Sequence, residues 1–431
     1  MDPKIEKSLR ISWQEGIPAS VMLGILDYYL VPFGLFLGAS TRGIGFLVAL
    51  PQLLASVAQL AAVELVHRVG SRLRFAVWMA AAQAATLLPM ALLALVAVPG
   101  RVAALVALAV CFRALNNLIG TAWGSLTSEY LPAERRGSYF GWRSQVVGIA
   151  SLMGVAVGGV LLHRMQGISL SRGFFLIFLL AALMRFVSAG LLAQMADLPW
   201  SRAAGSDFTF VMFLRRFQKS NFVKFVLYAA ALVFATNLAA PFFNVYMLRD
   251  LRFDYLTYMV LNLVVVLAGL MAFPIWGRHA DLVGNVRILK TIGWIVPFFP
   301  FLWLVSPSPW YLVGVQLVAG FVWGGFTLCS TNFVFDAVTP EKRVRCLGYF
   351  NLFQGLAIFL GALIGGFVAD HLPPIQGHSL LTLFAISGLL RMGVQLALSG
   401  QFQEVRSEAR PVSSLQLFFS VVGIRLRKRT G

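Results

Sequence analysis

The chain has 431 residues, of which 59% are hydrophobic and 12% are charged, and its formal net charge is +18. Soluble globular domains carry about 45–50% apolar and about 25% charged residues, so this composition excludes an ordinary soluble enzyme or binding domain. The alternating segments of about 10 residues that mark a membrane β-barrel are absent, which leaves helices as the predicted spanning elements.

Hydrophobic runs of about 20 residues recur from end to end, and each is long enough to cross a bilayer core of about 30 Å. The predicted fold class is an all-α membrane protein with twelve transmembrane helices in two pseudo-symmetric six-helix bundles. The twelve runs centre near Val21, Leu53, Ala85, Leu115, Leu152, Leu180, Val233, Val265, Val296, Phe321, Phe359 and Ser387.

Four segments follow from these runs. We expect an N-terminal bundle over residues 1–196, a cytoplasmic linker over 197–224, a C-terminal bundle over 225–400 and a basic cytoplasmic tail over 401–431. Within the linker, FTFVMFLRRFQKSNF combines helically spaced apolar residues with a basic end, which is typical of an interfacial helix.

The basic residues are unevenly distributed between alternate loops. With a cytoplasmic N-terminus, 26 Lys and Arg fall in the inward loops and tails, six fall in the outward loops, and Arg113, Arg185 and Arg391 lie within spans. This bias predicts that both termini are cytoplasmic. It makes anionic lipid on that face the expected partner of the positive charge, rather than nucleic acid. We interpret Arg185 and Arg391 as side chains that extend to the membrane interface.

Helix 1 holds the most central acidic residue, Asp27, in the stretch GILDYYLVPFG beside Tyr28. Helix 4 carries Arg113, Asn116 and Asn117 in FRALNNLIG, and the spacing places the three on one helical face with Gly120. Ionisable residues within a span are costly and usually face a cavity or a partner, so we do not expect this stripe to face lipid.

Residues 134–159 and 341–366 are two copies of one pattern, 207 residues apart, with five glycines in register. Each copy contains a G-x-x-x-G-G motif, which lets neighbouring helices approach closely. A repeat of this length in so apolar a chain predicts two similar membrane halves, as in a transporter.

The second half has fewer charges. Its candidate substrate-cavity residues are Asn237 and Asn244 in helix 7 and Trp323 and Thr327 in helix 10, which would suit an amphipathic organic molecule. The alternative is that the aromatic residues only fill the core.

The segment after helix 8 reads GRHADLVGNVR and contains Gly277, Asp281, Gly284 and Arg287. Together with the repeat and the twelve spans, this motif resembles the major facilitator superfamily. The resemblance implies that the four residues form a cytoplasmic latch between the halves in one transport state. The first-half equivalent, VELVHRVGSRLR, departs from the pattern because His67 stands where the family has an aspartate.

The resemblance also implies that helices 1, 4, 7 and 10 line a central cavity, so that Asp27 and Arg113 face the same space. The proton affinity of a carboxylate rises when it is desolvated and falls beside a cation, so an Asp–Arg pair can couple proton release to substrate binding. We therefore assign Asp27 and Arg113 as coupling residues. The alternative is a buried pair that only orients helices 1 and 4.

The expected protein is a secondary active transporter that moves a small organic or amphipathic solute by alternating access, coupled to protons, with antiport and export favoured. Import of an organic anion and flipping of a lipid or lysolipid are the alternatives. There is no G-x-x-x-x-G-K-[ST] phosphate loop, and we expect no cofactor, no metal and no catalytic residues. The expected location is the plasma membrane, which is the inner membrane if the source is bacterial, and we expect a monomer.

Overall fold

The computed structural model describes residues 3–131, 133–198, 220–338 and 340–405, and this part of the chain is helical, with no β-strand. The chain forms two compact units. One holds residues 1–205 with 241–259, and the other holds residues 206–240 with 260–431. The expected interfacial helix and most of the basic tail lie outside the described residues.

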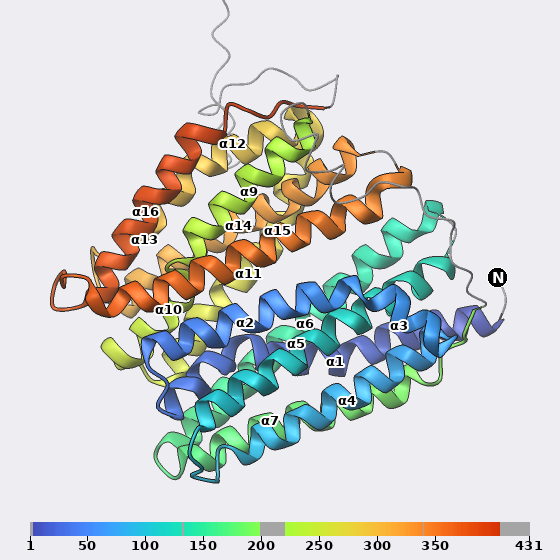
Figure 1. Ribbon diagram of the computed structural model, residues 1–431, viewed down its shortest axis with the longest axis horizontal. Helices are drawn as coiled ribbons and strands as arrows, with labels where there is room; N and C mark the ends of the chain where they lie inside the picture. Colours follow the sequence, from blue (N-terminus) through green and yellow to red (C-terminus); the bar gives the residue numbers. More distant parts are fainter. Residues whose placement is uncertain (1–2, 132, 199–219, 339, 406–431) are drawn as a thin grey trace, which may run out of the picture. The chain divides into compact units, whose positions relative to one another are not determined.

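The first unit is a bundle of long helices. In it α1 packs on α6 and α7, α4 packs on α5 and α7, and α2 packs on α5 (Figure 1). The helices are α1 (Pro3–Phe36), α2 (Thr41–Leu60), α3 (Ala62–Val69), α4 (Arg72–Leu92), α5 (Arg101–Glu129), α6 (Ala133–Gln166) and α7 (Leu170–Leu192).

In the second unit, α9 packs on α15 and α16, and α12 packs on α14. The elements from α9 to the end of the described chain are α9 (Asn221–Asn237), α10 (Ala240–Val245), η1 (Tyr246–Asp250), α11 (Tyr255–Val283), α12 (Asn285–Ile295), η2 (Val296–Phe298), α13 (Phe299–Leu302), α14 (Pro309–Ala337), α15 (Pro340–Val368), η3 (Ala369–His371) and α16 (Ser379–Leu398). Residues 241–259, which contain most of α10, all of η1 and the start of α11, cluster with the first unit.

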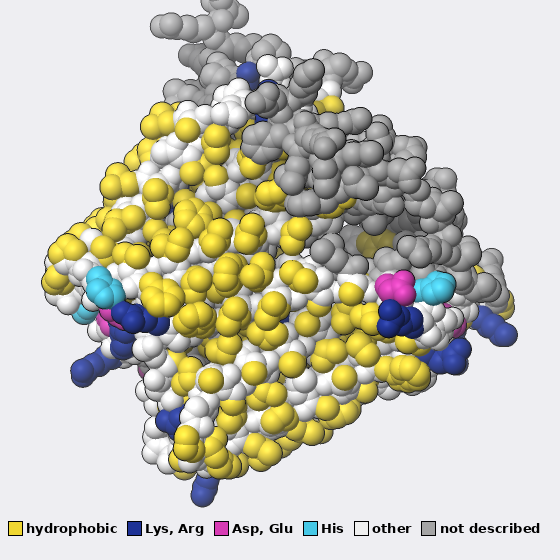
Figure 2. Space-filling view, viewed as in Figure 1, with side chains coloured by type: hydrophobic (Ala, Val, Ile, Leu, Met, Phe, Trp, Pro, Cys, Tyr) yellow, Lys and Arg dark blue, Asp and Glu magenta, His cyan; other side chains and the backbone are white. Residues whose placement is uncertain are grey.

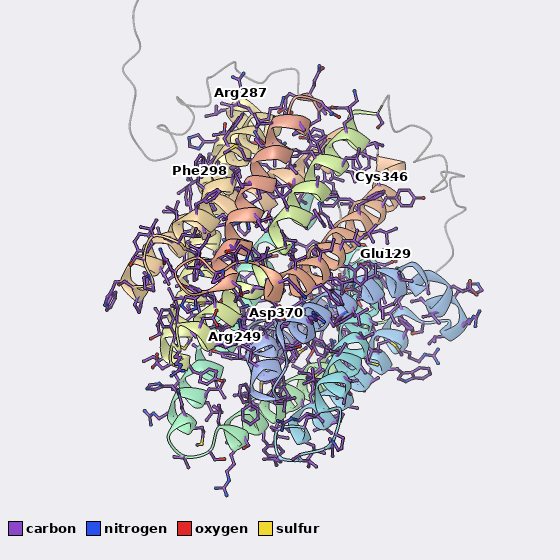
Figure 3. The ribbon with its side chains drawn as sticks, turned by 60° about the vertical axis from the view of Figure 1, so that its left-hand side comes forward. Glu129, Arg249, Arg287, Phe298, Cys346 and Asp370 are labelled. Atoms are coloured by element: carbon purple, nitrogen blue, oxygen red, sulfur yellow. The ribbon has the colours of Figure 1, made fainter. Side chains whose placement is uncertain are left out.

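Eleven stretches of the described chain are long and apolar enough to cross a membrane. Among the residues coloured by type in Figure 2, hydrophobic side chains predominate and charged ones are few. The stretch predicted near Val296 is present but interrupted at η2, where Phe298 lies (Figure 3). Pro297 and Pro300 lack the N–H that a continuous helix needs, so the α-helix gives way to a short 3-10 segment.

Two buried arginines overturn one interpretation. Arg185 is 4% exposed and Arg391 is 2% exposed, so neither extends to the membrane interface. In α16, Arg391 donates to the hydroxyl of Ser387 at 3.2 Å and to the carbonyl oxygen of Val296 at 3.3 Å. Val296 precedes Pro300 by four residues, so the guanidinium supplies a donor where the helix has lost one.

The repeated glycines bring helices into backbone contact, as the G-x-x-x-G-G motifs predict. A Cβ added at Gly154 of α6 would lie 2.2 Å from the carbonyl oxygen of Val21 in α1. Its counterpart Gly361 of α15 would place a Cβ 2.6 Å from the carbonyl oxygen of Phe234 in α9. The same device therefore joins the equivalent helix pair in each unit.

Candidate substrate and coupling site

Asp27 and Arg113 meet in the first unit. A guanidinium nitrogen of Arg113 on α5 donates to a carboxylate oxygen of Asp27 on α1, which joins residues 86 positions apart. The side chain of Asp27 is 40% exposed and that of Arg113 is 28% exposed, so the pair is accessible rather than sealed in the core. An accessible acid–guanidinium pair can exchange a proton or change partners without unfolding its surroundings.

The asparagines beside Arg113 have different surroundings. The side-chain oxygen of Asn116 accepts from the amide of Gln83 on α4 at 3.3 Å, and Gln83 is fully buried. Asn117 is partly exposed, and its carbonyl accepts from Thr121 one turn later. Asn116 therefore holds α4 to α5, whereas Asn117 has no such tie to another helix within the described residues.

Tyr28 and Asn244 also belong to the first unit. The carbonyl oxygen of Tyr28 accepts from the hydroxyl of Tyr258 at 2.6 Å, so the backbone beside Asp27 is tied to the start of α11. The neighbouring Tyr29 donates to the carbonyl of Val155 at 2.6 Å. Asn244 lies partly buried in α10. These bonds hold α1 in place at the two residues that follow Asp27.

The remaining cavity candidates lie in the second unit. Asn237 ends α9 and donates to the carbonyl of Val233 at 2.9 Å in its own helix. On α14, Trp323 packs edge-on against Phe326 with ring centroids 5.4 Å apart, and Thr327 is exposed. Trp323 thus contributes to core packing, while the side chain of Thr327 is exposed.

The predicted cytoplasmic latch lies at the junction of α11 and α12. Gly277 and Asp281 are within α11 rather than in a loop, and Arg287 lies in the first turns of α12 (Figure 3). Gly284 alone makes the turn, with φ +82°, a region that favours glycine. The carboxylate of Glu404 accepts from the backbone N–H of Val286 at 2.8 Å and so caps α12.

The corresponding turn in the first unit uses other charges. Gly70 ends α3 with φ +71°, and Glu64 pairs with Arg68 one turn away at 3.3 Å. Arg72 at the start of α4 is 1% exposed, and it binds both carboxylate oxygens of Glu129 at the end of α5 at 2.6 Å (Figure 3). A bidentate Arg–Glu pair therefore fastens this end of the bundle.

Sequence reasoning missed one buried acid. Glu15 is 5% exposed and lies 12 residues before Asp27 on the same helix. It follows a polar N-terminal segment, so its charge does not stand out in the sequence. Its carboxylate accepts from Arg143 of α6 at 3.1 Å. The available signal was an arginine inside the repeated segment, in FGWRSQ, which the loop count had assigned to the cytoplasm.

A contact between His163 and Asp254 joins the C-terminal end of α6 to the turn before α11. His163 lies 3.1 Å from Asp254, and Asp254 also accepts from the backbone N–H of Thr257 at 3.0 Å. Burial raises the pKa of Asp254, but hydrogen bonds from Thr257 and the charge of His163 lower it further, so the net pKa lies below its ordinary value.

Solved structures share this fold. A D-xylose-proton symporter superposes with a TM-score of 0.72 at 13% identity, covering 95% of this chain and 99% of that one. A mutant of the nucleoside transporter NupG gives 0.71 at 16% identity, covering 91% and 100%. At these identities the likeness establishes the fold alone.

Sequence comparison supplies the family. The vacuolar membrane amino acid uptake transporter fnx2 of Schizosaccharomyces pombe is 29% identical over 97 residues, which is 22% of this chain and 17% of that protein. The match thus spans less than a fifth of this relative. The sequence model of the Major Facilitator Superfamily matches residues 17–362 and, in an overlapping second match, residues 225–422. The chain therefore belongs to the Major Facilitator Superfamily of membrane transporters.

Proposed function

We propose that this protein is a proton-coupled secondary transporter of a small organic or amphipathic solute, working by alternating access with Asp27 as the coupling carboxylate. The ion pair between Asp27 and Arg113 carries the proposal. Both groups are accessible, and each lies within a long apolar helix, where an ionisable side chain is costly unless it has a use.

The pair offers a simple coupling cycle. In this cycle Arg113 and a proton compete for the carboxylate of Asp27. Arg113 neutralises the carboxylate in one state, and a proton neutralises it in the state in which a substrate group or a water draws Arg113 away. Proton binding and substrate binding then alternate at one place. The proposal is supported by the D-xylose-proton symporter, which has the same fold and whose name records transport together with a proton.

A partial match to a pattern of the family's exporters favours outward transport. Many proton-driven exporters of the superfamily carry R-x-x-Q/N-G in helix 4; here Arg113 and Asn116 match, and the glycine comes later, at Gly120. We place the protein in the plasma membrane as a monomer with both termini cytoplasmic, where its basic tail would meet anionic lipid.

The first experiment identifies a ligand. Purified protein in detergent is heated with a panel of small solutes and, separately, with lysolipids, since a ligand that binds the folded state raises the melting temperature. Solute hits support the proposal, and hits confined to the lipids would replace it with the flippase alternative.

The second experiment tests coupling in vesicles with that ligand. Asp27→Asn should abolish accumulation driven by a pH gradient while preserving exchange of labelled for unlabelled ligand, because exchange needs no net proton transfer. Asp370→Asn, an exposed acid on η3 (Figure 3), is the matched control and should retain both activities. Undiminished gradient-driven transport by Asp27→Asn would remove the coupling role.

A further inference from the structure

A second charged cluster lies in the first unit, away from the Asp27–Arg113 pair. Glu15 of α1 accepts from Arg143 of α6 at 3.1 Å through one carboxylate oxygen and from Ser188 of α7 at 3.1 Å through the other. Ser188 in turn accepts from Arg185 at 2.9 Å. One carboxylate therefore shares its charge between two arginines, one bound directly and one through a hydroxyl.

The cluster has an excess of positive charge and of hydrogen-bond donors. Arg143 donates through Nε to the carbonyl of Ser12 at 3.1 Å and through Nη2 to Glu15, and its Nη1 has no bond within the described residues. The Nε of Arg185 is buried with no partner in that same part of the chain. Burying an uncompensated charge is costly, so this arrangement is most stable with a further anion present.

An apolar ring lies beside the free donor. The guanidinium carbon of Arg143 is 4.1 Å from the ring centre of Trp123 on α5, and the Arg143 side chain is 15% exposed. Gly16 leaves room for the guanidinium group of Arg143, because a Cβ added at Gly16 would lie 2.7 Å from Nη2 of Arg143. A planar cation with one accessible edge and an indole beside it is suited to a carboxylate attached to a flat apolar group.

The charge balance of the cluster favours an added anion. Two buried guanidinium groups share the single carboxylate of Glu15, and loss of that charge would leave both without an anion, so the cluster gains from a further negative charge in either state of Glu15. The site is separate from the coupling pair, since Trp123 and Arg113 are ten residues apart on α5, or about 15 Å along a helix.

We propose that Arg143 and Arg185, with Trp123, form a binding site for a small organic carboxylate in the first unit. The site is additional to the coupling pair. It does not depend on proton coupling, because binding can be measured without transport.

Benzoate is the probe, and benzamide is its uncharged control of the same shape. Full-length protein in detergent is titrated with each at constant ionic strength, and binding is read from the saturable rise in melting temperature. Benzoate should stabilise the protein and benzamide should not. Arg143→Gln should abolish the benzoate effect, whereas Arg113→Gln should retain it.

Glu15→Gln gives a test in the opposite direction. Removing the competing carboxylate should tighten benzoate binding by about tenfold, although the unliganded protein melts earlier. A purely structural cluster would show the earlier melting without the tighter binding. If Arg143→Gln does not fold, Arg143→Lys keeps the charge without the planar fork and should weaken binding.

Three results would overturn the proposal. Equal shifts with benzoate and benzamide would show that charge is not recognised. An unchanged benzoate shift in Arg143→Gln would place the anion elsewhere. Loss of the shift in Arg113→Gln alone would assign the anion to the coupling pair instead.

Discussion

The repeated glycines allow a controlled measurement of helix packing, because only some of them are crowded. Gly154 faces α1 with no room for a side chain, since an added Cβ would lie 2.2 Å from the carbonyl oxygen of Val21. An ordinary contact needs at least 3.4 Å, so α1 and α6 would have to separate by about 1.2 Å. Gly141, from the same repeat and the same helix, has nothing within 4 Å of an added Cβ.

Gly154→Ala and Gly141→Ala therefore differ chiefly in packing. Both gain helix propensity, worth about 1 kcal/mol for Gly→Ala in an exposed helix interior. Overpacking costs about 1–3 kcal/mol, and Gly154→Ala alone incurs it, because the obstructing atom is backbone that cannot rotate away. At about 2–4 °C per kcal/mol for a unit of this size, we expect Gly154→Ala to melt about 2–12 °C below Gly141→Ala.

The assay is thermal unfolding in one detergent at one scan rate, because membrane proteins commonly unfold irreversibly and the apparent midpoint then depends on rate. Gly361→Ala and Gly348→Ala repeat the comparison in the second unit. There the crowded position has 2.6 Å to the carbonyl oxygen of Phe234 and the open one has nothing within 4 Å, so the difference should be smaller. Equal midpoints for Gly154→Ala and Gly141→Ala would refute the reasoning.

Three further predictions concern the ends of the bundles. Glu129→Gln should lower the free energy of unfolding by about 1–3 kcal/mol, because the buried Arg72 loses its charged acceptor. Adding Arg72→Met should recover most of the lost melting temperature. Gly284→Ala should destabilise the protein by at least about 1 kcal/mol, seen as a lower melting temperature, because φ is +82° and an added Cβ would lie 2.2 Å from a carboxylate oxygen. The pKa of Asp254 lies below its ordinary value near 3.8, so its contribution beside His163 is present above that pH and is lost as the pH falls further. Asp254→Asn should thus melt below the wild type at about pH 6, and the difference should shrink as the pH falls below 3.8, so a constant difference would contradict the assignment.

Much of the fold follows from hydropathy and the repeat, because both depend on many residues at once. Long apolar runs predict the spans, and the crowded Gly154 and Gly361 occupy the register that the repeat indicates. The interrupted span near Val296 was not foreseen, because Pro297 and Pro300 leave the stretch just as apolar while removing its helical hydrogen bonds.

The candidate site could be predicted only where one polar residue stands out against an apolar background. Asp27 and Arg113 do so, and they lie together in the structure; their coupling role stays a proposal. Glu15 was overlooked because it follows a polar N-terminal segment and its partners come from helices far along the chain. Pairwise contacts over 128 and 173 residues leave no local pattern to detect.

The contact between Arg391 and the carbonyl of Val296 has a consequence for how such chains diverge. The prolines of η2 and α13 and the arginine of α16 are tolerable together but costly apart, since the buried guanidinium would lose one of its acceptors without the break and the break would lack a donor without the guanidinium. Relatives should therefore keep or lose them as a set. A relative with an unbroken ninth helix should carry an aliphatic residue where this protein has Arg391.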